Sequence, residues 1–430
     1  LASFTNFYGV TILLKNCNVD IFDTATTSGP LPLIALVHPR NLSLIIDGGS
    51  FNTSCSSIIS TIFNMLDADG VNLNIRGGAA LNLINTSIYT EAVDRSLIAV
   101  SNSLLPLATR FLTNFDVVIE DAFGLIECDS AARVWSIAAK DKYDMNSWSF
   151  QSSRNRFTLV APSTSVFFVE TAGSFTSPPI LENFDVNIVD TVISAQFTDN
   201  CTMIHISQVE LKHDNSTALQ ISGGSVTITD TDPGNAASTA VASFVHLQTF
   251  PTLGSKSMVE ATITNGASVT LNGPIATSLV HLASGRGYEP SLVIDGGANV
   301  RLISNKSYIQ LMRVVSSVSD VARATVRVED ATLHMDGMSA TSLIYFLQLQ
   351  RAYVTAELSN ATVFLRANGL AQTSIITPPV KWRDGDGSNV AGLTTSGGGG
   401  PTCTSKARAA FSAGSHQGET SHRSKLRIAA

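Results

Sequence analysis

The chain has little charge and no long apolar run, and both shortages narrow its class. Of its 430 residues only 14% are Asp, Glu, Lys or Arg, against roughly 25% in an average soluble chain, and 44% are hydrophobic. This composition excludes a disordered chain, and a net charge of −7 gives no reason to expect nucleic-acid binding. No apolar segment reaches the roughly 18–20 residues of a membrane-spanning helix. Ser and Thr must therefore cover the surface, as in many extracellular β proteins.

Cysteine and catalytic motifs are equally sparse. The 5 cysteines are too scattered for a disulfide framework, and none forms the Cys-x-x-Cys pair of a zinc site. There is no GxSxG, no HExxH, no Walker loop and no GxGxxG. We therefore expect no metal and no cofactor. The chain begins at Leu1 without a secretory leader, so we interpret it as a fragment.

One pattern recurs along the chain: an alternating apolar strand, a short break rich in Asp, Asn, Gly and Ala, and a second alternating strand. Alternation with period two predicts half-buried strands, and the break supplies residues that tolerate a positive φ. The most similar copies are SLIIDGG, from Ser43 to Gly49, and SLVIDGG, from Ser291 to Gly297. The residues that we assign to the breaks are Asp47, Gly48, Asp121, Asp190, Asn265, Gly266, Asp295, Gly296, Asp330 and Asn360.

The breaks recur roughly every 30–40 residues, and a degenerate copy from Phe157 to Val169 fills the one double-length interval. A unit of this size cannot bury its own apolar face and must stack on its neighbours. We therefore predict an all-β fold, a right-handed parallel β-helix (solenoid) of about ten or eleven irregular 30–40-residue repeats over residues 1–377.

Two other architectures remain open. β-Sandwich domains would show a longer period, and Asp-Gly between alternating strands is also a signal for antiparallel hairpins. The uneven spacing favours the solenoid because a coil tolerates insertions at its corners. We expect such insertions at Cys55–Leu66, Glu91–Phe111 and Ala131–Arg156, the last of which holds Trp135 and Trp148.

The composition changes at residue 378. Residues 378–430 include the run TSGGGGPT and carry seven basic against three acidic side chains, a net of +4. We interpret this Gly/Ser-rich, mildly basic segment as a disordered tail.

Three pairs of acids are the nearest candidates for glycoside hydrolysis, which needs two carboxylates about 5–10 Å apart. They are Glu120 with Asp121, Glu329 with Asp330, and Asp230 with Asp232. The first two pairs lie at breaks, where turn formation explains the Asp, and adjacent strand residues point to opposite faces. We therefore expect no catalytic residue and no enzyme activity.

Two weaker features also receive structural interpretations. An apolar pair followed by His recurs, and a His repeated at one strand end is more often a half-buried structural residue than a base. These histidines are His38, His205, His246 and His281. Asp67–Gly70 and Asp384–Asn389 resemble parts of calcium loops but lack the further acids and the closing Glu, so we assign both to turns.

Seven Asn-x-Ser/Thr sequons are candidate N-glycosylation sites: Asn41, Asn52, Asn85, Asn200, Asn215, Asn305 and Asn360. The repeat form, the SLIIDGG and SLVIDGG copies, and the Ser/Thr-rich, Lys-poor texture over residues 1–377 resemble the dispersed gene family proteins of trypanosomatids. The resemblance implies a large β-helical surface protein with a role in adhesion to host or matrix. It implies membrane anchoring only through a segment missing from this chain, and it carries over no catalytic residue.

We therefore expect a fragment of a non-enzymatic cell-surface structural or adhesion protein that makes multivalent contacts with matrix or surface glycans or proteins. A carbohydrate-active β-helix enzyme and a non-functional fragment of a multicopy surface-protein gene remain as alternatives. Three or more acids converging in one groove would favour the enzyme, whereas acids scattered over turns would favour the binding protein.

Overall fold

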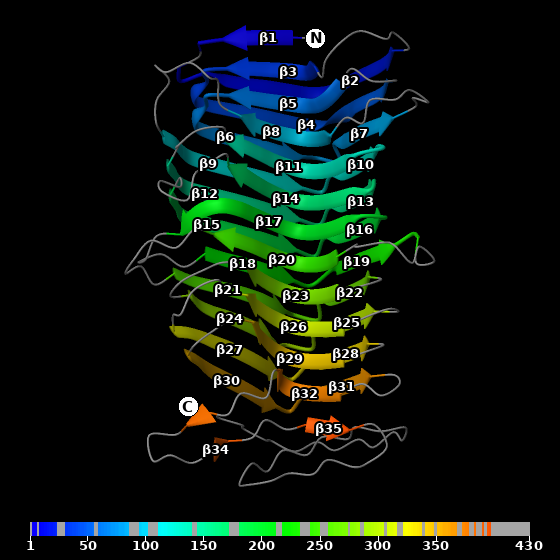
Figure 1. The fold of residues 1–430 in the computed structure, drawn as a ribbon. Helices are drawn as coiled ribbons and strands as arrows, with labels where there is room; N and C mark the ends of the chain where they lie inside the picture. The colour runs from blue at the N-terminus through cyan, green and yellow to red at the C-terminus, as the bar shows by residue number, and fades with distance from the viewer. Residues whose placement is uncertain are drawn as a thin grey trace. The chain divides into compact units, whose positions relative to one another are not determined.

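Figure 1 shows the computed structural model, which describes strands and turns and, among its described residues, no helix. The described residues are 2–6, 8–23, 31–55, 59–85, 94–101, 111–139, 144–171, 180–211, 217–232, 241–249, 257–273, 276–283, 288–304, 308–315, 321–337, 340–347, 351–367, 372–377, 382–383, 389–390 and 394–396. They form two compact units, Leu1–Lys212 with Gly224–Val226 (unit 1) and His213–Gly223 with Thr227–Ala430 (unit 2).

In unit 1 the chain winds in coils, and each coil adds one strand to a parallel sheet that we name sheet A. Neighbouring strands pair in register, as where Trp135 lies opposite Ile98 on one side and Phe167 on the other. The strands of sheet A in unit 1 are β1 (Ala2–Thr5), β3 (Leu31–Val37), β5 (Ile59–Leu66), β8 (Arg95–Ser101), β11 (Ala131–Ala139), β14 (Ser163–Thr171) and β17 (Asn200–Leu211).

The rest of each coil in unit 1 forms sheet B, which has two arms that meet at a corner (Figure 1). β2 (Thr11–Asp23) and β4 (Arg40–Cys55) run through the corner and belong to both arms. The first arm continues with β6 (Asp69–Arg76), β9 (Phe111–Glu120), β12 (Asp144–Ser153) and β15 (Ile180–Val189). The second arm continues with β7 (Ala80–Asn85), β10 (Phe123–Glu127), β13 (Arg156–Val160) and β16 (Val192–Phe197).

Unit 2 repeats this plan. Its sheet A holds β20 (Val241–Thr249), β23 (Ala276–Ala283), β26 (Tyr308–Val315), β29 (Ala340–Leu347) and β32 (Gln372–Thr377). Its first arm holds β18 (Thr217–Ser222), β21 (Ser257–Thr264), β24 (Tyr288–Ile294), β27 (Val321–Glu329) and β30 (Arg351–Ser359). Its second arm holds β22 (Ser268–Gly273), β25 (Asn299–Ser304), β28 (Thr332–Gly337) and β31 (Thr362–Ala367), while β19 (Ser225–Asp230) is divided between the units.

The ladders of both units are parallel, which confirms an all-β parallel solenoid and makes the antiparallel-hairpin alternative wrong. Antiparallel pairing occurs after residue 377, where β35 (Thr394–Ser396) joins β32 and β33 (Trp382–Arg383) joins β34 (Asn389–Val390). The three expected insertions are also wrong as insertions, since they contain β5, β8, β11 and β12. Their small and polar residues conceal the apolar alternation that marks the other strands.

A left-handed residue turns the corner of sheet B in successive coils. In unit 1, Asp121, Arg154 and Asp190 have φ of 52°, 54° and 46°, and in unit 2, Asn265 and Asp330 have φ of 54° and 48°. An L-residue adopts this region at a cost of roughly 1–2 kcal/mol, which Gly avoids and the short side chains of Asn and Asp reduce. The Gly, Asn and Asp residues of the breaks are therefore explained by the left-handed backbone of the corner.

The remaining break residues lie at the same corners. Gly48, Gly266, Gly296 and Asn360 have φ of 70°, 72°, 59° and 48°. Gly48 lies opposite Asn16 of β2, whose φ is 49°, because Lys15 pairs with Asp47 and Cys17 with Gly49. Asp47 and Asp295 precede their corner glycines.

The residue before the second arm is small and faces the core in most of the described coils. In five coils it is a buried alanine, with 0–7% of its surface exposed: Ala79, Ala122, Ala267, Ala298 and Ala331. At Gly224 any side chain would meet the backbone of Thr191 one coil away. Larger residues at this position must therefore make specific bonds.

Asn155 is such a residue, and its 2% exposed side chain bonds to two neighbouring corners. Its Oδ1 accepts from the backbone N–H of Ala122 at 2.8 Å, and its Nδ2 donates to the carbonyl oxygen of Ile119 at 2.6 Å and to Ser152 Oγ at 2.8 Å. Its own N–H points to Thr191 Oγ1 at 3.4 Å. The amide thus forms hydrogen bonds with buried backbone groups that are not paired in the β-ladders.

Aromatic rings fill the core of unit 1 at the same level. Trp135 is 0% exposed and Trp148 1%, with ring centroids 5.7 Å apart. Phe115 stacks on Trp148 at 4.2 Å, and Phe167 contacts Trp135 at 5.1 Å. Both tryptophans were expected in an insertion, but they lie in the core at the meeting of sheets A and B.

We predict that Asn155→Ala lowers the free energy of unfolding by about 1–3 kcal/mol, because it leaves a buried N–H and a buried C=O group without a hydrogen-bond partner. Urea denaturation followed by circular dichroism measures the loss. Asn72→Ala, on the exposed face of β6, is the matched control and should change stability by less than about 0.5 kcal/mol. Equal effects of the two substitutions would contradict the bonding role of Asn155.

Candidate functional site

The first candidate acid pair is neutralised by an arginine from the next coil. Arg154 Nε donates to Asp121 Oδ1 at 2.8 Å and Arg154 Nη2 to Asp121 Oδ2 at 3.0 Å, and the same Nη2 also pairs with Glu120. The hydrogen bond to Arg154 lowers the pKa of Asp121, and the two acids raise the pKa of the guanidinium. A carboxylate held ionised in this way is unsuited to act as a general acid.

The other two acid pairs are also committed to local structure. Glu329 pairs with Arg327 on its own strand, and Asp330 accepts a hydrogen bond from Asn360 of the next corner. Asp230 is 6% exposed, and its Oδ1 accepts from the backbone N–H of Asp232 at 2.9 Å, which forms a local turn.

The partial calcium loops show no gathering of ligands. Asp67 is buried with its Oδ2 3.7 Å from His38 Nδ1, and Asp69 accepts a hydrogen bond from Thr113. Residues 384–388 of the second loop lie outside the described residues. Within the described ranges, no group of three or more His, Cys, Asp or Glu is arranged to hold a metal ion.

The recurring histidines lie on sheet A with one exception. In unit 1, His205 lies opposite Phe168, and in unit 2, His246 lies opposite His281, which lies opposite Arg313. His38 instead lies beyond the end of β3 with a φ of 53°. Burial, together with the positive charge of Arg313, lowers the pKa of His246 to about 4. This imidazole is neutral at physiological pH.

Three cysteines whose side chains the structure describes carry free thiols. Cys128 and Cys201 are buried, and Cys17 is partly exposed. Burial raises the pKa of Cys128, and it raises the pKa of Cys201 to about 12, although Thr164 Oγ1 lies 2.9 Å from the Cys201 sulfur. The two buried thiols are therefore poor nucleophiles.

Sheet A of unit 1 breaks the usual alternation at Val134. The Trp135 ring packs on Phe167 in the core, whereas the Arg133 guanidinium lies 3.8 Å above the ring of Phe168. Consecutive residues Phe167 and Phe168 point to opposite faces. Residues two apart on a regular strand share a face, but Arg133 lies on the outer face and Trp135 on the inner face. Between them, Val134 has no paired residue in the register of β11 and β14.

An ordered group of side chains, here called the outer column, lies on successive coils of unit 1: on the residue before β8 and on the next three strands of sheet A, β11, β14 and β17. Arg133 Nη1 pairs with Asp94 Oδ2 at 3.0 Å, and Ser130 Oγ donates to Asp94 Oδ1 at 2.6 Å. Beyond Arg133, Phe168 stacks on His205 with centroids 4.7 Å apart and planes 12° apart. The column thus presents a carboxylate, a guanidinium, a phenyl ring and an imidazole in sequence along the sheet.

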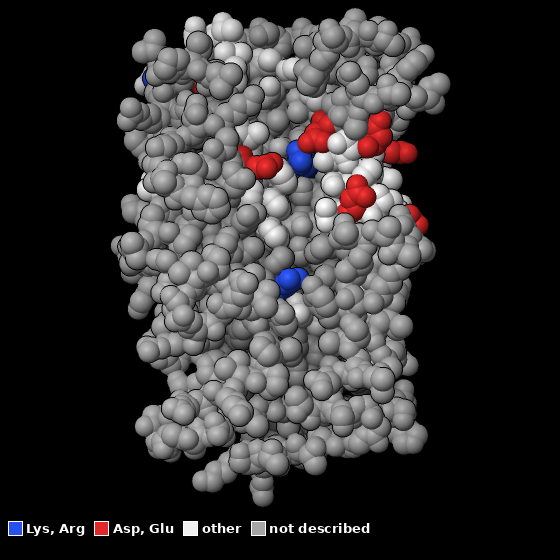
Figure 2. All heavy atoms as spheres, viewed as in Figure 1, with Lys and Arg blue, Asp and Glu red and all other residues white. Residues whose placement is uncertain are grey.

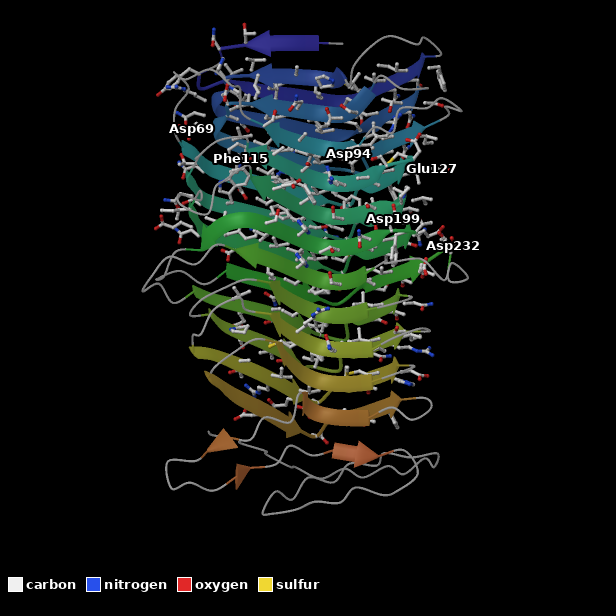
Figure 3. All side chains as sticks on the ribbon, in the orientation of Figure 1. Asp69, Asp94, Phe115, Glu127, Asp199 and Asp232 are labelled. Atoms are coloured by element: carbon white, nitrogen blue, oxygen red, sulfur yellow. The ribbon has the colours of Figure 1, made fainter. Side chains whose placement is uncertain are left out.

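Further acids lie on the same flank. Glu127, Asp129 and Asp199 are exposed, at the ends of β10 and β16 and on the turns that lead to β11 and β17. Figure 2 shows carboxylates gathered there beside a basic side chain. Figure 3 shows Asp94, Glu127 and Asp199 on one side of the fold. The outer column therefore has an acidic border.

The sequence predictions selected only His205 of this column. Asp94, Arg133 and Phe168 were missed because they belong to three different coils and carry no local motif. The available signal was register: Phe168 occupies the position in β14 that His205 occupies in β17.

The predicted sequons occupy several settings. Asn41, Asn200 and Asn360 are exposed, and Asn85 ends β7. Asn52 lies in a ladder, where its Nδ2 donates to Asp20 Oδ1 at 2.6 Å and its Oδ1 accepts from Asn82 at 2.7 Å. Asn215 and Asn305 lie outside the described residues.

Comparisons with protein-family models, curated proteins and solved structures find no match to this chain. Across the described part of the chain, no helix has the length and apolarity to cross a membrane.

We predict that His246 makes the protein sensitive to acid. Its pKa is about 4 in the folded state and 6.5 in the unfolded chain, so its contribution is present above pH 6.5 and is lost as the pH falls towards 4. Urea denaturation of the native chain and of His246→Gln at pH 7 and pH 4.5 measures this. The native chain should lose on the order of 2 kcal/mol more than the variant. Equal losses would contradict a buried, neutral imidazole.

Proposed function

We propose that this chain is a non-enzymatic structural or adhesion protein of the cell surface, and that the outer column of unit 1 is a contact site for glycans or matrix proteins. The observation that carries the proposal is the ordered series Asp94, Arg133, Phe168 and His205 on successive coils, in which each side chain contacts the next. The four side chains come from successive coils but do not share one register position: Arg133 lies opposite Ser165, whereas Phe168 lies opposite Ser136 and His205. The column therefore offers donors, acceptors and ring edges along a diagonal of the sheet.

The chemistry of the column suits weak recognition of hydroxyl-rich or acidic ligands. The Arg133 side chain is 17% exposed and that of Asp94 is 50% exposed, so both reach solvent while their geometry is fixed by each other. A guanidinium donates several hydrogen bonds, and the carboxylate accepts them. Several such contacts along a rigid fold can reach useful strength together although each is weak.

The state of the candidate catalytic acids supports a binding function over the alternative of a polysaccharide lyase or hydrolase. Asp121 and Glu120 share Arg154, Glu329 pairs with Arg327, and Asp230 is used in a turn. Glycoside hydrolysis needs two carboxylates of different protonation facing one bond, and these acids are scattered over corners instead.

The proposal also covers the handedness of the coil, the number of repeats, the C-terminal segment and the location of the protein. We propose a right-handed coil of about ten or eleven irregular repeats over residues 1–377, followed by a disordered tail at 378–430. The proposed location is the cell surface, with anchoring through a segment of a longer parent. The resemblance to the dispersed gene family proteins of trypanosomatids and the exposed sequons Asn41, Asn200 and Asn360 support this location.

Binding of the full chain to an array of glycans and extracellular-matrix proteins tests the proposal. We predict reproducible binding by folded protein and at least a tenfold weakening by Arg133→Ala, because the column loses its donor and Asp94 its partner. Arg156→Ala, an exposed arginine on β13, is the matched control and should bind as the native chain does. Far-UV circular dichroism establishes that each variant is folded.

No binding by the folded native chain would contradict adhesion and favour a passive fragment. Equal weakening by both arginine substitutions would place the contact elsewhere and attribute it to net charge. Turnover of a polysaccharide by the folded chain would overturn the non-enzymatic proposal.

A further inference from the structure

The second arm of unit 2 presents a row of three side chains on its outward face. Arg301 of β25 lies opposite His334 of β28, which lies opposite Phe364 of β31 (Figure 1). Side chains alternate along a strand, and the inward neighbours of Arg301, which are Val300 and Leu302, are both 0% exposed. The row, here called the arm site, therefore points away from a fully packed part of the core.

The two ends of the arm site differ in chemistry. Phe364 is 39% exposed, and its ring centroid lies 5.7 Å from that of His334, with planes 46° apart. Arg301 is exposed, and no described residue forms an ion pair or a hydrogen bond with its guanidinium. Neighbouring strands are about 4.8 Å apart, so the two ends are separated by roughly 10 Å. The arm site thus holds an apolar ring and an unpaired cation at a fixed separation.

The charges around the arm site leave the positive charge of Arg301 uncompensated. Asp336, in the next outward row, lies opposite Arg366 in the ladder. The other nearby acids, Asp295 and Asp330, lie at the corners that precede the strands. A ligand with spaced negative charges is therefore drawn to Arg301, whereas a densely charged polymer also meets the corner acids.

Polar side chains border the arm site on the side of the corners. Asn299, Thr332 and Thr362 form the neighbouring outward row of the ladder, and Asn299 and Thr362 are exposed. Amide and hydroxyl groups both donate and accept hydrogen bonds, and His334 adds ring nitrogens between the two ends. An aromatic ring beside a row of such groups is suited to a sugar, which has apolar C–H faces and hydroxyl groups around its edge.

We propose that the arm site binds uronate-containing glycans, with one sugar ring packed on Phe364 and a carboxylate of the same chain bound by Arg301. Aromatic rings offer a large apolar surface for the C–H face of the sugar, and the polar row bonds to its hydroxyl groups. A guanidinium donates two parallel hydrogen bonds to a carboxylate. The arm site shares no residue with the outer column of unit 1, so the two sites can be tested separately.

Surface plasmon resonance of the full chain on immobilised hyaluronan, in which every second sugar is a uronate, tests the site. Carboxyl-reduced hyaluronan, which keeps the sugar rings but loses the charges, is the comparison. We expect the native chain to bind hyaluronan at least fivefold more tightly than the reduced polymer. Added salt should shrink this preference because it screens the charges.

Two substitutions separate the ends of the site. Arg301→Gln should abolish the preference for hyaluronan and leave binding to the reduced polymer unchanged, whereas Phe364→Ala should weaken binding to both polymers at least fivefold. Arg327→Gln is the matched control, because Arg327 lies on the first arm of unit 2, pairs with Glu329 and carries the same charge. It should bind as the native chain does, and circular dichroism establishes that each variant is folded.

Several results would overturn the arm site. They are absence of hyaluronan binding by the folded native chain, equal binding of the two polymers, and equal losses on Arg301→Gln and Arg327→Gln. A loss on Arg133→Ala without one on Arg301→Gln would also overturn it, while leaving the outer column and the proposed function in place. Retention of the Arg301-dependent preference by Arg133→Ala would support the arm site as a separate binding site.

Discussion

The corner of sheet B, where one residue of each coil adopts a left-handed backbone, is the constraint on which the rest of this fold depends. The corner sets where the first arm ends, which residue faces the core next, and how each coil lies on its neighbours. Gly meets the requirement without cost, and Asn or Asp meets it at reduced cost. The small residue before the second arm follows from the same geometry, since there the backbones of successive coils come close. The Asp-Gly and Asn-Gly pairs recur in the sequence because each coil needs this one backbone conformation.

The corner also explains how polar residues enter the core of a stack that is otherwise apolar. Asn155 and Thr191 occupy the small-residue position and bind backbone groups of the adjoining corners, so their burial is compensated. On the outside, the corner acids are used in the same local way, through Arg154 and Asn360. In unit 1 the chemistry that remains for recognition lies away from the corners, on sheet A, where the break at Val134 presents Arg133 beside Phe168.

Much of the fold could be predicted from the sequence because two signals agreed at each clear repeat. Alternating apolar residues mark the strands around Asp47 and Asp295, and the break chemistry marks the corners between them. The coil that contains β12 was interpreted as an insertion because some of its inward residues are polar, as where Ser152 faces Asn155 instead of an apolar neighbour. Its corner residue, Arg154, has a positive φ, a conformation for which arginine has no preference. The outer column was missed for a different reason. Its members meet only after four coils are set in register, and that register depends on loop lengths between coils that vary.

The most direct test of the account is the removal of one coil from unit 2. Ile263 lies opposite Ile294, so deletion of residues 264–294 joins two corners in register, whereas deletion of 264–293 leaves one extra residue in the first arm. Because side chains alternate with period two, the extra residue turns the apolar face of that arm outward. The account predicts that the first variant unfolds cooperatively with near-native stability in urea and that the second loses several kcal/mol or fails to fold. Equal stability of the two variants would contradict the claim that the corner fixes the register of the stack.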